Sequence, residues 1–257
     1  YVEGLAHFNG WRGREHSPDK AVGLMERAAE LGETEAMLSL GQWYLSDTLG
    51  PPDRVRAKAW FQKAADADDI DAVFELGLLA EEDGNYVEAA SQYRRALDSK
   101  QDEGACGLAR LLLEGKGVTQ DVAEALEILE LASSEYESAE AWYLLGVLYD
   151  EGRVVEQDRE RAGGEFYLAA QQGHVLAQMR YGESAESGYG DPDAPLDAYV
   201  WTHTALQHLP AEFTSRAEAT LARIASKMTP ETRLQAEAAA QKNRFTGALP
   251  LRPALRV

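Results

Sequence analysis

The sequence predicts an all-α solenoid of about six helix-turn-helix repeats, closed by a C-terminal helical cap. Three observations lead to this prediction. Alanines recur every 32 to 37 residues, a bulky residue followed by a tiny one precedes most of them, and glycine-centred turns lie in between. A fixed period of this length is typical of repeat proteins, in which each unit packs on its neighbours.

The second helix of each repeat has the clearest pattern. It starts at an alanine, has a large residue three or four positions later, and has small residues seven and eight positions later. Offsets of 0, 4, 7 and 8 place residues on one face of an α-helix. The six segments start at Ala21, Ala57, Ala89, Ala125, Ala162 and Ala198, and their large residues include Met25, Phe61, Tyr93, Leu129, Phe166 and Trp201.

The first helix of each repeat is marked by a bulky residue followed by a tiny one. Glycine inside a helix costs about 1 kcal/mol relative to alanine, so its recurrence indicates that a partner helix approaches closely at that point. We therefore expect the two helices of each repeat to cross at the small residue. The pairs are Leu40-Gly41, Leu76-Gly77, Leu108-Ala109, Leu145-Gly146 and Tyr181-Gly182.

Turns and helix starts follow the same period. Glycine-containing turns occur around residues 49–52, 113–118 and 150–154. Asp53, Asp121 and Asp158 stand just before second helices, where a carboxylate caps the helix or favours its positive end. The turn at residues 83–86 is shorter and accounts for the 32-residue spacing.

This pattern of small residues, turns and acidic helix starts resembles the SEL-like repeat branch of the tetratricopeptide superfamily. The resemblance is clearest in Ala36-x3-Leu40-Gly41, followed by Asp53-x2-Arg56-Ala57-x2-Trp60-Phe61-x2-Ala64-Ala65. It spans residues 1 to about 208, although the third repeat resembles an ordinary tetratricopeptide repeat. It implies a right-handed α-solenoid whose first helices line a concave face.

Two further helices are expected after the repeats. Residues 211–228 place Phe213, Ala217, Leu221, Ile224 and Met228 on one face, and a helix restarts at Thr229-Pro230 and runs to about Arg244. We expect a repeat solenoid over 1–210, capping helices over 211–245 and an extended tail over 246–257. The tail carries leucines and arginines that would suit the concave face of its own chain or of a neighbour.

Composition excludes several classes of function. The chain has 44 acidic and 25 basic residues, a formal charge of −19, which argues against binding nucleic acid or an anionic membrane. No apolar run approaches the roughly 20 residues of a membrane helix. A single cysteine, Cys106, excludes an intrachain disulfide and a multi-cysteine metal site.

No motif predicts catalysis, a metal or a cofactor. The histidines His7, His16, His174, His203 and His208 lack metal-ligand spacing. Gly115-Lys116-Gly117 lacks the context of a phosphate loop. The acidic run 66–71 is a better inter-repeat turn than a calcium loop. Two carboxylates acting on a glycan or a peptide remain as an alternative.

The resemblance places the candidate partner-binding residues on the first helices. They form an apolar stripe flanked by carboxylates, with Arg110 as its single positive charge, which suits a peptide with apolar anchors and Lys or Arg. In the alternative, Phe74, Tyr143 and Met179 pack between repeats and the acids only keep the surface soluble. The candidates are Leu38, Gln42, Phe74, Leu78, Glu81, Glu82, Cys106, Arg110, Tyr143, Val147, Asp150, Glu151, Met179, Glu183 and Glu186.

The sequence thus predicts a non-enzymatic protein–protein interaction scaffold in a bacterial envelope or signalling assembly. SEL-like proteins are often exported, so a periplasmic location is expected, with a cytoplasmic one as the alternative. The chain begins with Tyr1 rather than Met, and we expect that an upstream segment has been removed.

Overall fold

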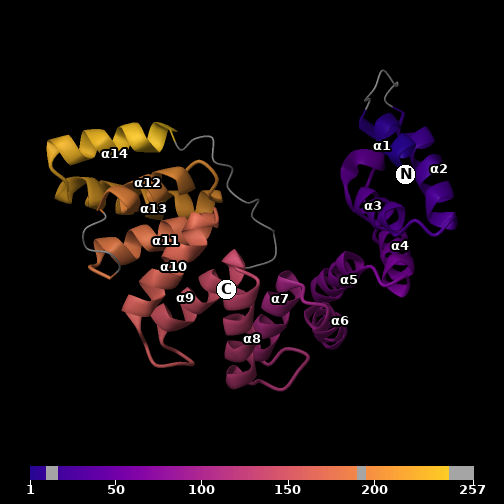
Figure 1. Cartoon of the computed structure of the whole chain (residues 1–257), viewed down its shortest axis with the longest axis horizontal. Coiled ribbons are helices and arrows are strands. Elements are labelled where there is room, and N and C mark those ends of the chain that lie inside the picture. Colours follow the sequence, from indigo (N-terminus) through magenta and orange to yellow (C-terminus); the bar gives the residue numbers. More distant parts are fainter. Residues whose placement is uncertain (10–16, 190–194, 243–257) are drawn as a thin grey trace. The chain divides into compact units, whose positions relative to one another are not determined.

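The structure is a computed structural model that describes residues 1–9, 17–189 and 195–242. These residues form fourteen α-helices and a short 3-10 helix, and no strand occurs among them (Figure 1). The chain divides into two compact units, Tyr1–Asp121 and Val122–Val257. Each unit is described by itself.

The first unit contains seven α-helices. Helices α1 and α2, α3 and α4, and α5 and α6 pack as pairs, and α2, α4 and α6 each pack on the next helix in the chain. This nearest-neighbour packing is the mark of a solenoid. The helices are α1 (Val2–Asn9), α2 (Pro18–Glu30), α3 (Thr34–Leu45), α4 (Arg54–Asp66), α5 (Ile70–Glu82), α6 (Tyr86–Asp98) and α7 (Asp102–Glu114), with the 3-10 helix at Asp47–Leu49.

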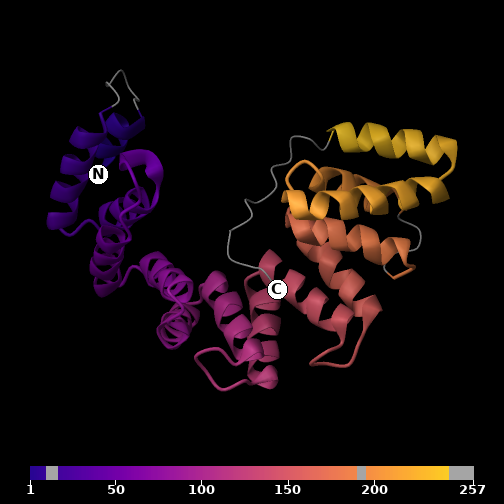
Figure 2. The ribbon, with the colours of Figure 1, turned by 180° about the vertical axis from the view of Figure 1, so that it is seen from behind.

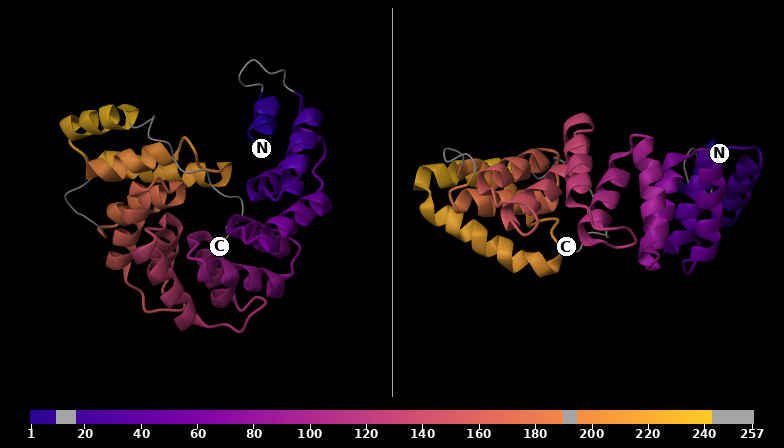
Figure 3. Two further views of the ribbon diagram at one scale, coloured as in Figure 1. Left: turned by 45° about the vertical axis from the view of Figure 1, so that its right-hand side comes forward. Right: turned by 90° about the horizontal axis from the view of Figure 1, so that it is seen from below.

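The second unit continues the pattern and ends in two extra helices. Helix α13 packs on α11 and α12, and α14 packs on α12, as Figures 2 and 3 show for the orange and yellow segments. The helices are α8 (Val122–Glu135), α9 (Ala139–Glu151), α10 (Arg159–Gln171), α11 (Val175–Glu186), α12 (Pro195–Ala205), α13 (Ala211–Lys227) and α14 (Pro230–Lys242).

The predicted fold class is confirmed. In chain order the first twelve helices supply a first and a second helix for each of the six predicted repeats, and α13 and α14 follow as the two C-terminal helices. The expected end of the last helix near Arg244 and the expected tail over 246–257 lie outside the described residues.

The tight helix crossings predicted at the glycines are also confirmed. A Cβ atom built on Gly77 would lie 2.6 Å from the Tyr93 ring, and one on Gly146 would lie 2.6 Å from the Phe166 ring. In the sixth repeat the residue that faces Gly182 is Thr202 rather than the neighbouring Trp201. The Thr202 hydroxyl donates to the Ala198 carbonyl at 2.7 Å, which satisfies this fully buried polar group.

Side-chain caps hold several helix starts. The carboxylates of Asp53 and Asp158 accept the backbone N–H groups of Arg56 and Arg161, as predicted. Thr229 caps α14 through the N–H of Thr232. Sequence reasoning did not single out four other caps, which are Asp69, Asn85, Ser138 and His174.

The glycine crossing can be tested by adding one methyl group. We expect Gly146→Ala to lower the free energy of unfolding by about 1–3 kcal/mol, because the new Cβ overlaps the Phe166 ring. Gly164→Ala in α10 is the matched control, since nothing lies within 4 Å of its added Cβ. Because alanine has the higher helix propensity, this variant should raise the free energy of unfolding by up to about 1 kcal/mol. Urea unfolding followed by circular dichroism measures both, and equal midpoints would refute the crossing.

Candidate functional site

The fifteen candidate residues lie on helices α3, α5, α7, α9 and α11, the first helices of five successive repeats. They occupy the positions three before and one after the small residue in every one of these helices, and positions four or five after it in α5, α9 and α11. We call these positions in all five helices the helix-one stripe. In the first unit Leu38 and Leu78 are half-buried, and Gln42 and Glu82 are exposed.

Five apolar candidates are buried instead of lining an open surface. Met179 is 1% exposed and packs with Val175, Ala205 and Ala217. The Phe74 ring lies 5.8 Å from that of Tyr93. For these side chains the burial favours packing within and between repeats over contact with a partner. The buried candidates are Phe74, Cys106, Tyr143, Val147 and Met179.

Two charged candidates of the first unit form a buried ion pair. Arg110 of α7 contacts both carboxylate oxygens of Glu81 of α5 at 2.6 Å. The Tyr93 hydroxyl of α6 donates to the same carboxylate at 2.8 Å. Burial and the nearby Glu81 raise the pKa of Tyr93, so the hydroxyl keeps the proton that it donates. This network joins three helices and is a structural contact.

Removing one partner of this ion pair should be costly. We expect Arg110→Met to lower the free energy of unfolding by about 3–5 kcal/mol, because Glu81 is left buried and unpaired. Adding Glu81→Leu should restore most of the loss. Arg27→Met is the control, since its pair with Glu30 is exposed and is worth about 1 kcal/mol or less. Equal losses at Arg110 and Arg27 in urea unfolding would contradict a buried network.

Other acids in the first unit also have basic partners. Arg54 of α4 contacts Glu82 at 2.5 Å and Asp83 at 2.8 Å. At this end of α5, three carboxylates, those of Glu81, Glu82 and Asp83, therefore meet two guanidinium groups, those of Arg54 and Arg110. The surroundings of the helix-one stripe keep an excess of negative charge here.

In the second unit the balance is reversed. Three stripe carboxylates, those of Asp150, Glu183 and Glu186, meet more basic groups than they can neutralise. Their partners are Arg159, Arg180, Arg216, Arg223 and Lys227. The last three come from α13, whose positions 216, 223 and 227 share one helix face. Among the candidate residues Arg110 is the single positive charge. Residues 211–257 contain 8 basic and 4 acidic residues, and this basic excess was the sequence signal for the three partners from α13.

The contact between α11 and α13 should depend on pH. Hydrogen bonding to Lys227 and Arg223 lowers the pKa of Glu186 from its ordinary value of 4.5, despite the opposing effect of burial. A carboxyl with a lowered pKa in the folded chain stabilises it above the ordinary pKa, and this contribution is lost as the pH falls through the lowered pKa.

We therefore expect wild-type stability to fall as the pH drops below about 4.5, and Glu186→Gln to reduce the steepness of this fall. Thermal unfolding over an acid pH series measures it. Glu212→Gln, at an exposed position in the first turn of α13, is the comparison. An unchanged pH slope in Glu186→Gln would contradict the role of this carboxylate.

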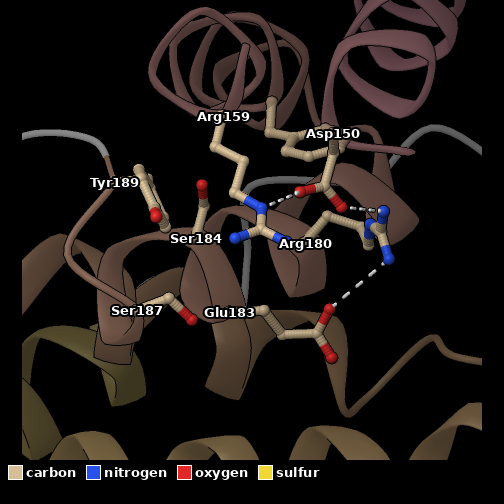
Figure 4. Close-up of a pocket in the computed structure, with 8 residues that line it drawn as sticks. Asp150, Arg159, Arg180, Glu183, Ser184, Ser187 and Tyr189 are labelled. Carbon is tan, nitrogen blue, oxygen red and sulfur yellow. Dashed lines mark hydrogen bonds and ion pairs between the residues drawn. The ribbon is translucent and has the colours of Figure 1, made fainter. Parts of the chain in front are cut away.

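A pocket of about 250 Å³ lies among the charged groups of the second unit (Figure 4). Asp150 accepts a hydrogen bond from Arg180 at 2.7 Å and lies 3.8 Å from Arg159. The Arg180 guanidinium also lies 5.2 Å from the centre of the Phe166 ring. The lining residues are Asp150, Arg159, Phe166, Arg180, Glu183, Ser184, Ser187 and Tyr189.

The remaining candidates for chemistry have structural roles or structural surroundings. His174 caps α11 by accepting the Ala177 N–H, and its other ring nitrogen lies 3.0 Å from Glu140. Asp69, in the acidic run, caps α5, and Cys106 is buried. Within the described ranges no three His, Cys, Asp or Glu side chains are placed to hold a metal ion. None of the described helices is long and apolar enough to span a membrane.

The paired helices and the helix-one stripe define a helical-repeat protein of the solenoid class. The Sel1 repeat model matches residues 4–33, 34–69, 102–135 and 139–174, just over half of the chain. The chain therefore belongs to the Sel1 repeat family, whose members are generally protein–protein interaction scaffolds. The model leaves out residues 70–101, which include the shorter repeat formed by α5 and α6.

The matches cover only part of the length of the curated relatives. The chain is 29% identical over 155 residues to the Sel1-repeat-containing protein YjcO of Escherichia coli K12, covering 57% of this chain and 66% of YjcO. It is 26% identical over 235 residues to the alginate biosynthesis protein AlgK of Pseudomonas syringae pv. tomato, covering 90% of this chain and 48% of AlgK.

Solved structures agree on the fold. The c5321 protein, a protective antigen of uropathogenic Escherichia coli, matches with a TM-score of 0.77 and 22% identity, over 99% of this chain and 56% of its own. A Sel1 repeat protein from Oxalobacter formigenes matches with a TM-score of 0.72 and 27% identity, over 85% and 64% of the two chains.

Proposed function

We propose that this protein is a non-enzymatic scaffold that binds a protein or peptide partner along the helix-one stripe. The observation that carries the proposal is the arrangement of that stripe in the first unit. Leu38, Leu45, Leu78 and Leu113 recur on α3, α5 and α7 as half-buried side chains, with Gln42 exposed among them. A series of half-buried leucines with polar neighbours suits an extended or helical peptide.

The expected partner presents apolar anchors and basic side chains to the first unit. Glu82 and Glu114 are exposed on α5 and α7, and acids outnumber arginines at this end of α5. Charges at the edge of a binding surface raise the association rate and the specificity for a partner more than they raise affinity. Nucleic acid is a poor candidate because the chain carries a charge of −19.

A catalytic role has less support. The two carboxylates that line the pocket, Asp150 and Glu183, contact the guanidinium groups of Arg180 and Arg216. A glycosidase of the usual kind needs two carboxyl groups facing the scissile bond, one of which gives up a proton. Carboxylates held by arginine are suited to fixing helices rather than to proton transfer.

The stripe can be tested by site-specific photo-crosslinking of the full chain in extracts of its own source. We expect a photoreactive amino acid at Gln42 or Glu82 to form an adduct with one and the same partner. Gln62 and Glu127 are matched controls, because they are exposed residues of the same types on the second helices α4 and α8. Adducts at the controls only, or equally at all four positions, would contradict the proposal.

Charge reversal gives a second readout of the same surface. Glu82→Lys with Glu114→Lys should weaken binding of the cross-linked partner and reduce its salt dependence. Glu127→Lys with Glu160→Lys makes the same charge change on second helices. Glu81 and Asp150 are left unchanged because their ion pairs are more buried than the exposed pair of Glu82 with Arg54.

We also propose that the scaffold acts in the bacterial envelope, with an exported location. Support comes from the relative named as an alginate biosynthesis protein, which matches 90% of this chain. Fractionation of cells that express the native gene tests the location, and recovery with cytoplasmic markers would contradict it.

A further inference from the structure

The pocket of the second unit has more positive charge than its own carboxylates neutralise. Arg159 and Arg180 line it, and Arg216 contacts Glu183 at its border, with Nη2 to Oε2 at 2.6 Å. Three guanidinium groups therefore share two carboxylates, those of Asp150 and Glu183. One positive charge remains uncompensated at the pocket.

The two arginines that line the pocket differ in how their hydrogen-bond donors are used. Arg180 donates to Asp150 at 2.7 Å, and its guanidinium carbon lies 5.2 Å from the centre of the Phe166 ring. Arg159 lies 3.8 Å from Asp150, a distance at which the two attract each other but share no hydrogen bond. Arg159 donates no side-chain hydrogen bond to any described residue, so its N–H groups are available there for another acceptor.

Hydroxyl groups add to this donor set. Ser184 and Ser187 line the pocket, and within the described part of the chain neither hydroxyl makes a hydrogen bond. In Figure 4 the Ser184 side chain lies between the Tyr189 ring and the Arg159 guanidinium. The Tyr189 ring centre is 5.6 Å from the Arg159 guanidinium carbon, so an aromatic wall flanks the free donors.

We propose that this pocket binds one carboxylate group of an acidic side chain presented by the partner, with Arg159 as the main ligand. The inference rests on the proposed scaffold function. A guanidinium fork matches a planar carboxylate, and a single uncompensated charge suits a monoanion better than a phosphate dianion. About 250 Å³ accommodates one side chain.

The position of the pocket supports this assignment. Asp150 and Glu183, which hold Arg180 and Arg216, are themselves helix-one stripe residues on α9 and α11. A partner that follows the stripe of the second unit therefore passes the free donors of Arg159. Such a partner would present acidic side chains to the second unit of this protein and basic side chains to the first.

The probe for the test is N-acetyl-glutamate methylamide, which carries only the side-chain carboxylate. Titrated into the full isotope-labelled chain, it should give saturable NMR shifts of the Ser184 and Ser187 backbone amides. Arg159→Gln should weaken this binding by about tenfold or more. Arg153→Gln, which removes an exposed arginine from the preceding turn, should leave the affinity within about twofold.

Three further ligands define the chemistry. The glutamine analogue of the probe lacks the charge and should not saturate. Inorganic phosphate and glucuronate should bind more weakly than the glutamate probe. Absence of saturation, equal effects of Arg159→Gln and Arg153→Gln, or tighter binding of any of the three ligands would overturn the proposal. Circular dichroism of both variants checks that the helices are retained.

The outcomes separate this inference from the scaffold function. If the glutamate probe fails while cross-links at Gln42 and Glu82 persist, only the carboxylate pocket is refuted. If the probe binds as described but no stripe adduct forms, the scaffold function is refuted.

Discussion

In several repeats, the packing of a large side chain from the second helix on a glycine of the first helix sets how the two helices cross. Phe61 lies on Gly41, Tyr93 on Gly77 and Phe166 on Gly146. Each glycine costs about 1 kcal/mol in helix propensity, which burial of an aromatic ring can more than offset. Because this contact fixes how each first helix is rotated, it also decides which of its residues form the stripe.

A second recurring contact links α5 to α7 in the first unit, and α9 to α11 and α11 to α13 in the second. Glu81 of α5 pairs with Arg110 of α7, and Asp150 of α9 pairs with Arg180 of α11. Glu183 of α11 then pairs with Arg216 of α13. Helix α13 thus takes the position that the first helix of another repeat would have, and it covers α11 and α12 in the same way.

These internal ion pairs change what the acidic composition means. Many carboxylates that the sequence places on the stripe hold neighbouring helices together, so they are not free counter-charges for a partner. Recognition is left to the half-buried leucines and exposed acids of the first unit, and to the arginine-rich pocket of the second. The formal charge of −19 describes the whole chain, but the local charge at the stripe differs in sign between the units.

The sequence by itself determined the helices, their pairing and the caps at Asp53 and Asp158, because these depend on spacing and propensity within about 40 residues. Only the tertiary structure decided that Met179 and Cys106 are buried while Leu78 stays half-exposed. A periodic pattern identifies one face of a helix. A small rotation of that helix against its neighbours, however, decides which residues of that face are buried and which are exposed. The partners of Glu183 and Glu186 were likewise decided in three dimensions, because α13 brings Arg216 and Arg223 across from more than 30 residues away in the chain.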